Sequence, residues 1–349
     1  MVNPNKASEE EISHFNKRQV NLPEHKLKQV QENQSPQNRA SFIRDLDIEK
    51  NVQLAQILFY CLTYIVTPAL KKFMCGCNFL SRSAKDFEFS QVVRDIDFYR
   101  KMYPYFLDPT IHVSDEIFRQ AVYARNVICH MNLTCLSENW EYYLYVWAQL
   151  LRSIGNPEAA DDLHVVYNYM IRGQYRQAMH HQTFLVNSPR YNERTAIGMG
   201  VVLYGCLSQY LAPALRNFLI NKKGQSSSTS FDVFVNLKQI IEQQKFDSNY
   251  VAEDGWVNKD YQMLKLSMDA RHGCCHGYFA NIFNYWRSYL ENWRDLLYRI
   301  DAREASAEMQ EMLNIIRRYQ RQDTQVDLTR LLFWLRDKHV DWTGGPISS

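Results

Sequence analysis

An internal duplication constrains the fold of this chain more than any other feature of its sequence. The hexapeptide Arg125-Asn126-Val127-Ile128-Cys129-His130 returns as Arg271-His272-Gly273-Cys274-Cys275-His276, 146 positions later (271 − 125). The surroundings repeat at the same interval, in the pairs Trp140 and Trp286, Trp147 and Trp293, Tyr143 and Tyr289, Leu144 and Leu290, and Leu150 and Leu296. Upstream, Cys61-Leu62-Thr63 and Pro68-Ala69-Leu70 match Cys206-Leu207-Ser208 and Pro213-Ala214-Leu215 at an interval one residue shorter. The chain is therefore expected to form two related halves rather than an array of short repeats.

The duplication distinguishes the two motifs from an Arg and a His that have the same spacing by chance. Arg176 and His181 have the same spacing as Arg125 and His130, but Gln322 and Asp327 stand at the corresponding places of the second half. We interpret this third match as accidental, because an isolated Arg and His at a fixed spacing is a weak signal.

The spacing of apolar residues predicts an all-α fold, because these residues recur at intervals of three and four almost throughout. Ser114 is expected to cap the helix that ends in the first motif, with Asp115 and Glu116 in its first turn. The expected helices cover 47–74, 88–103, 115–130, 137–154 and 158–176, and in the second half 196–221, 231–245, 259–275, 278–300, 303–321 and 326–338.

Composition sets the expected domain boundaries. Residues 1–41 are polar and nearly free of aromatic residues, which predicts a disordered tail without the apolar core of a secretory signal. A helical-bundle domain is expected over 42–190 and a second over 191–340, packed as a pseudo-twofold dimer, followed by a tail over 341–349. Lys222–Ser230, rich in Ser and Gly, is expected to be a flexible loop.

The most apolar stretches, 54–70 and 195–215, occupy equivalent places in the two halves. We expect buried core helices there, with membrane-spanning helices as the alternative. The eight cysteines lack the spacing of a zinc site, and we expect reduced thiols in a cytoplasmic protein, with the nucleus as the alternative. The formal net charge of +2 is uninformative by itself, but no run of Lys or Arg stands out, so any RNA contact is expected in a limited cleft.

Arg and His together suit chemistry on a phosphodiester. Arg is a permanent cation whose geometry matches phosphate oxygens, and His exchanges a proton near neutral pH. RNA supplies its own nucleophile in the 2′-hydroxyl, so a base, an acid and positive charge are sufficient. No motif for a nucleotide, redox or metal cofactor is found in the sequence, and none is expected.

Both motifs resemble the signature of the HEPN superfamily of all-α ribonucleases, which is an Arg, commonly followed by Asn, Asp or His, and then a His after four to six intervening residues. Arg125-Asn126 with His130 and Arg271-His272 with His276 fit this signature. The resemblance covers about 42–340, although only the motifs are specific. It implies that two motifs form one composite, metal-independent site, and that cleavage leaves a 2′,3′-cyclic phosphate and a 5′-hydroxyl. The two copies differ in their second and third positions, where His272-Gly273 replaces Asn126-Val127.

The sequence thus predicts an endoribonuclease that cleaves single-stranded or looped RNA. His130 and His276 are the expected general base and acid, in an order left open, and Arg125 and Arg271 are expected to bind the scissile phosphate. Asn126 and His272 are expected to orient these groups. The alternative is a non-catalytic helical adaptor that binds RNA or protein. A regulatory protein partner and a homo-oligomer are left open, and no membrane partner is expected. The four tryptophans that repeat between the halves (Trp140, Trp147, Trp286 and Trp293) are expected in core or interface packing rather than in base stacking.

Overall fold

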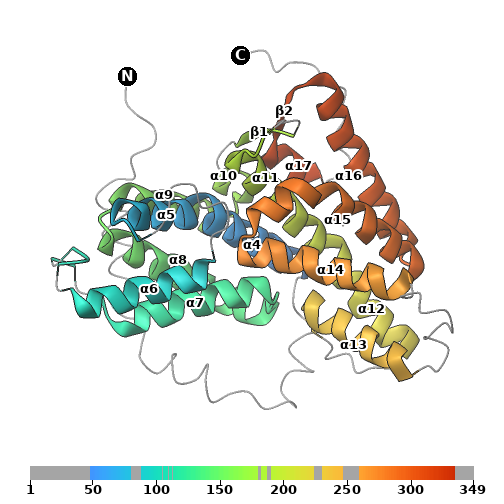
Figure 1. Ribbon diagram of the computed structural model, residues 1–349, viewed down its shortest axis with the longest axis horizontal. Helices are drawn as coiled ribbons and strands as arrows, with labels where there is room; N and C mark the ends of the chain where they lie inside the picture. The colour runs from blue at the N-terminus through green and yellow to red at the C-terminus, as the bar shows by residue number, and fades with distance from the viewer. Residues whose placement is uncertain are drawn as a thin grey trace.

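The computed structural model describes residues 48–79, 88–103, 105–108, 110–111, 113–179, 182–186, 190–223, 230–246 and 259–334. Both expected tails, 1–41 and 341–349, lie outside the described residues, as do residues 224–229 of the expected loop. Within the described residues the chain is almost entirely helical, which confirms the predicted all-α class (Figure 1).

The first half forms a long apolar helix followed by shorter ones. Its elements are α4 (Ile48–Tyr60), the π-helical segment η2 (Cys61–Val66), α5 (Thr67–Gly76), α6 (Phe89–Met102), α7 (Asp115–Cys129), α8 (Leu133–Ser153), α9 (Pro157–Ile171), α10 (Tyr175–Ala178) and β1 (Thr183–Leu185).

The second half repeats the order of the elements from α4 to α9, but its strand comes before its last short helix and not after it. It consists of α11 (Glu193–Cys206), the π-helical segment η3 (Leu207–Leu211), α12 (Ala212–Lys223), α13 (Val233–Phe246), α14 (Lys259–His276), α15 (Phe279–Arg299), α16 (Arg303–Gln322), β2 (Gln325–Asp327) and α17 (Leu328–Trp334). In Figure 1 the blue-to-green helices α5 to α9 lie on one side of the molecule, and the yellow-to-red helices α12 to α16 lie on the other.

Both long apolar helices contain a π-helical segment at the same place, just before a proline. Pro68 and Pro213 lack the backbone N–H that an α-helix needs, and a proline ring clashes with the carbonyl four residues earlier. A local widening to π geometry relieves this clash without ending the helix. The predicted long helices are therefore each continuous, with one irregular turn.

The two long helices contact each other in the interior. The ring of Phe59 on α4 stacks on the ring of Tyr204 on α11, with centroids 3.9 Å apart, and Gln56 donates to the Ser208 hydroxyl at 3.1 Å. By length and composition, Ile48–Gly76 and Glu193–Asn221 would each be able to cross a membrane, but both are mostly buried inside the molecule. They occupy the core positions that the sequence analysis favoured.

The tryptophan pairs also lie where core packing was expected. Trp147 and Trp293 are fully buried, Trp286 is buried, and Trp140 packs partly buried against the core. All eight cysteines are free thiols.

Three local features differ from the expectations. Helix α8 begins at Leu133 rather than near 137, because the Asn132 side chain accepts from the backbone N–H of Cys135 and caps the helix. The helix expected over 158–176 ends at Ile171, where Gly173 takes a left-handed conformation (φ 70°), and α10 follows separately. Strand β1 pairs antiparallel with β2, which joins the ends of the two halves.

Candidate functional site

Each motif lies at the carboxyl end of its helix, as predicted. Helix α7 begins after Ser114, although this residue makes no side-chain capping bond, and His130 is its C-cap. Helix α14 ends at His276. The chain then turns through a left-handed residue in both halves, which is Met131 in the first (φ 48°) and Gly277 in the second (φ 70°). These two positions are 146 apart (277 − 131), so the turn is repeated with the motif.

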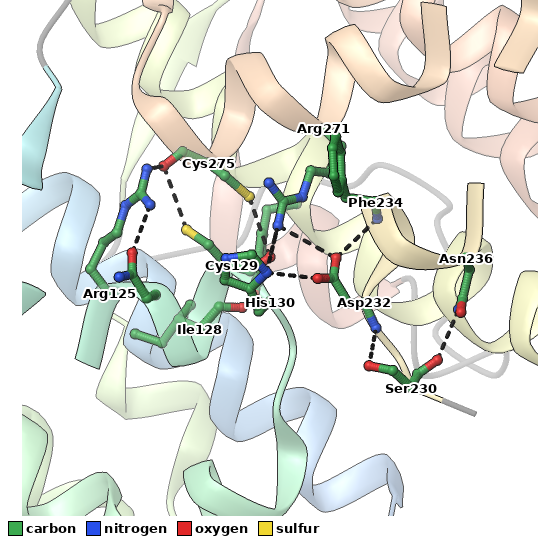
Figure 2. Close-up of polar contacts among 12 residues, drawn as sticks. Arg125, Ile128, Cys129, His130, Ser230, Asp232, Phe234, Asn236, Arg271 and Cys275 are labelled. Carbon is green, nitrogen blue, oxygen red and sulfur yellow. Dashed lines mark hydrogen bonds and ion pairs between the residues drawn. The ribbon is translucent and has the colours of Figure 1, made fainter. Parts of the chain in front are cut away.

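The two helix ends meet, and each arginine reaches across to the opposite one. Arg125 donates to the backbone carbonyl of Cys275, and Arg271 donates to that of Cys129 at 2.9 Å (Figure 2). The last carbonyls of a helix have no partner within it and carry its negative dipole end, so a guanidinium stabilises them. Both arginine side chains are only 4% exposed.

The thiols of Cys129 and Cys275 also reach across to the carbonyl at the opposite helix end. Cys129 donates its S–H to the Cys275 carbonyl (3.5 Å) and Cys275 to the Cys129 carbonyl (3.7 Å). Burial raises the pKa of the Cys129 thiol, but a hydrogen bond from Cys275 and the charges of both arginines outweigh it and bring that pKa to about 7. The same thiol contact, together with burial, raises the pKa of Cys275. The contact region is therefore polar although it is buried.

His130 faces a carboxylate of the second half. Its Nδ1 lies 2.6 Å from Oδ2 of Asp232, and Arg271 Nη2 lies 3.3 Å from the same Nδ1. Asp232 is almost fully buried, whereas the His130 side chain is 51% exposed. The histidine thus has one nitrogen at a buried acid and a large accessible surface elsewhere.

His276 faces a carboxylate of the first half. Its Nδ1 lies 3.7 Å from Oε1 of Glu88, which is also 3.6 Å from Arg125. The His276 side chain is 26% exposed. Burial raises the pKa of Glu88, but the nearby His276, the hydrogen bond from the backbone N–H of Gln91 and the charge of Arg125 outweigh it and lower the pKa to about 2. Glu88 is therefore a carboxylate at neutral pH.

The second polar position of each motif also lies in this region. Asn126 accepts from Arg125 at 3.0 Å. The ring of His272 lies 4.0 Å from that of His276, and Tyr278 lies beside both rings. Burial, with the nearby charges of His276 and the two arginines, lowers the pKa of His272, so this ring is neutral at neutral pH.

The structure brings all six predicted residues to one region, with a pairing that the sequence did not indicate. Arg125 and His276 share Glu88, and Arg271 contacts His130, so the Arg and the His that face the same acid come from different motifs. The two arginines are also buried rather than open to a ligand.

Glu88 and Asp232 were not predicted from the sequence. Each precedes a helix and caps it, α6 by Glu88 and α13 by Asp232, through backbone N–H groups of Gln91 and Phe234. They stand 144 positions apart (232 − 88), close to the interval of the motifs. An acidic residue before equivalent helices in both halves was the signal available in the sequence.

Among the described residues, no group of three or more His, Cys, Asp or Glu side chains is arranged to hold a metal ion. Comparison of the chain with protein-family models, with curated proteins and with solved structures finds no match.

Proposed function

We propose that this protein is a metal-independent endoribonuclease of the HEPN type, built from two homologous helical domains packed about a pseudo-twofold axis. The observation that supports this most strongly is the reciprocal site, in which each half supplies the carboxylate for the other half's histidine. Two accessible imidazoles, each held by a carboxylate of the opposite half, are suited to a reaction that needs one base and one acid.

The proposed reaction is an in-line transesterification. One of His130 and His276 removes the proton of the 2′-hydroxyl while the 2′-oxygen forms a bond to phosphorus. The other histidine donates a proton to the 5′-oxygen as its bond to phosphorus breaks. The products are a 2′,3′-cyclic phosphate and a 5′-hydroxyl, and the two histidines end with their protons exchanged.

The arginines have a different place in this proposal than the sequence suggested. Both guanidiniums are buried and bonded to backbone carbonyls, so we propose that they hold the two motif helices together and place positive charge behind the histidines. Such fixed charge in a buried region stabilises a developing phosphorane without reorganisation. Asn126 fixes Arg125, and His272 supports the ring of His276.

The proposed substrate is single-stranded or looped RNA in the cytoplasm, or alternatively in the nucleus. In-line attack needs a backbone that can rotate, which a rigid A-form helix resists. A protein partner that regulates access to the histidines is compatible with this proposal.

One observation favours a second candidate function. Both arginines are buried and make contacts that stabilise the junction, which a non-catalytic helical adaptor for RNA or protein would also need. The exposure of His130 favours the enzyme, because a residue kept only for structure has no need of an open face.

The test is a cleavage assay on single-stranded RNA in the presence of EDTA, with wild type, His130→Ala, His276→Ala and the double variant. Wild type is expected to cleave in EDTA and to leave cyclic-phosphate ends. Each single variant is expected to lose roughly 10²-fold to 10⁴-fold in rate.

His181→Ala is the matched control, because Arg176 and His181 have the motif spacing without a repeat. Unchanged cleavage in the site variants would exclude the composite site. No cleavage by folded wild type over a broad set of RNAs would favour the adaptor.

A further inference from the structure

The two carboxylates of the site divide their oxygens in the same way. Asp232 uses Oδ1 to accept from the backbone N–H of Phe234 (2.9 Å) and Oδ2 to face Nδ1 of His130 (2.6 Å). Glu88 uses Oε2 for the N–H of Gln91, and Oε1 faces Nδ1 of His276. One oxygen of each acid is fixed by a helix end, and the other points at a histidine of the opposite half.

We infer that Asp232 and Glu88 are positioning residues that hold His130 and His276 with the proton on Nδ1, so that Nε2 is the atom which accepts or donates the proton of the reaction. The use of Nε2 in RNA cleavage rests on the function proposed above. The tautomer itself does not depend on that function and can be measured without RNA.

The orientation of Asp232 is fixed from several directions. Its own N–H donates to the Ser230 hydroxyl (3.0 Å), and Asn236 donates to the Ser230 carbonyl (2.8 Å), so the turn before α13 is closed. Arg271 lies 3.4 Å from Oδ1. With Oδ1 held by the helix end and by the guanidinium, Oδ2 is the oxygen left for His130 (Figure 2).

The tautomer follows from the donors and acceptors around Nδ1. A carboxylate only accepts hydrogen bonds, so the Nδ1 that faces Asp232 has to carry a hydrogen. Arg271, in contrast, only donates hydrogen bonds. It therefore cannot bond to an Nδ1 that carries a hydrogen, although its Nη2 lies 3.3 Å from this atom. Its Nη2 instead donates to the Cys129 carbonyl. In the neutral imidazole the lone pair is then on Nε2, whereas free histidine prefers the opposite tautomer. The partner of one ring nitrogen thus sets the chemistry of the other.

The contact is looser at His276. Its 3.7 Å separation from Glu88 is beyond a good hydrogen bond, and Glu88 is also more exposed than Asp232. We therefore expect the Nδ1–H form to prevail at His130 and to be less complete at His276.

The experiment is nitrogen NMR of the full chain labelled with ¹⁵N-histidine, at about pH 8.5, where an ordinary imidazole is neutral. The loss of one signal in His130→Gln assigns His130 among the ten histidines. Wild type is expected to show His130 as the Nδ1–H tautomer. His130 found with its proton on Nε2 in wild type would overturn the inference, whatever the Asp232 variants show.

Asp232→Asn is the variant that isolates the contact. Asn caps helices as well as Asp does, so its side-chain oxygen keeps the bond to Phe234 while an amide NH₂ replaces Oδ2. That amide donates to Nδ1, and His130 is expected to change to the Nε2–H tautomer. Asp232→Ser, which also caps, is the second variant if the first folds poorly. Asp260→Asn is the matched control, because Asp260 pairs with Arg299 and lies in the first turn of α14, at the other end of the helix from His276.

Cleavage measured on the same variants separates the two proposals. If the tautomer changes and the rate falls by roughly 10²-fold or more, both proposals are supported. If the tautomer changes and wild type does not cleave RNA, the proposed function fails and the positioning role stands. If Asp232→Asn leaves the tautomer of His130 as in wild type, the positioning role is wrong whatever the rate.

Discussion

The His130 side and the His276 side of the site share their inner contacts and differ at their accessible rim. On both sides an arginine reaches the carbonyl at the opposite helix end, and a thiol donates to the same carbonyl. At the rim, His130 has a short bond to a buried acid, whereas His276 has a longer contact with a more exposed acid and lies with its ring 4.0 Å from that of His272. The inner contacts are made by equivalent residues of both halves at one junction. A substitution in either half therefore disturbs the contacts of both, which keeps the two sides alike. The rim is not constrained in this way and has diverged.

The largest expected difference in stability between the two sides comes from substitution of the arginines. Arg271→Ala leaves the buried Asp232 without its cation, and breaking a buried pair in this way costs about 3–5 kcal/mol. Arg125→Ala removes a charged hydrogen bond beside a more exposed acid, at about 1.5–3 kcal/mol. Urea unfolding monitored by circular dichroism measures both. Equal losses would mean that the two sides are equivalent in stability.

Acid sensitivity is expected on the Glu88 side. The pKa of Glu88 is lowered to about 2 from an ordinary value of 4.5, so this carboxylate stabilises the folded state above pH 4.5. That contribution is lost as the pH falls from about 4.5 to about 2. Glu88→Gln lacks it, and its free energy of unfolding is expected to fall less steeply than that of wild type over this window. Parallel pH profiles of the two proteins would contradict the prediction.

A smaller effect on stability is expected from the Tyr204 hydroxyl, which donates a hydrogen bond on the His130 side only. Tyr204 donates to the carbonyl of Ile128 in the first motif helix at 2.8 Å, whereas Phe59 stands at the corresponding place of the first half and has no hydroxyl. Tyr204→Phe is expected to cost about 0.5–1.5 kcal/mol, since the Ile128 carbonyl keeps its bond from the N–H of Met131. Phe59→Leu, which changes the ring without a hydrogen bond, is the comparison. No loss of stability in Tyr204→Phe would show that the hydroxyl does not support the His130 side.

The smallest expected effect is an increase in the free energy of unfolding. Gly273 lies in α14 where Val127 lies in α7, and a Cβ there would be 3.8 Å from Ile282, in ordinary contact. Gly273→Ala is therefore expected to stabilise the protein by up to about 1 kcal/mol. The same substitution at Gly277 is the control, because its left-handed backbone (φ 70°) disfavours a side chain. A loss of stability in Gly273→Ala would mean that this glycine is needed for the approach of the two helix ends.

The fold class and most helices were predictable because they depend on local periodicity. The features that were missed depend on single residues or distant partners. Asn132 starts α8 one position after Met131 adopts a left-handed conformation, which no pattern of apolar residues reveals. The strands β1 and β2 are three residues each and pair across the two halves, so neither is recognisable alone.

The site was predictable as a set of residues and not as a set of pairs. Duplication identified Arg125, His130, Arg271 and His276, because a repeated motif is visible in the sequence. The crossing of the pairs is set by how the helix ends meet, which the sequence does not contain. Glu88 and Asp232 escaped notice because an acid before a helix is also an ordinary cap.

The crossed pairs have a consequence for the order in which the chain is made. Domains of a growing polypeptide generally fold from the amino terminus as they leave the ribosome. His130 then emerges well before Asp232 and Arg271, the residues that complete its surroundings. On the proposed function, the nascent first half carries an unfinished nuclease while it is surrounded by ribosomal and messenger RNA. Its histidine receives its partner only once the second half has been synthesised, which delays activity until both halves of the site are present.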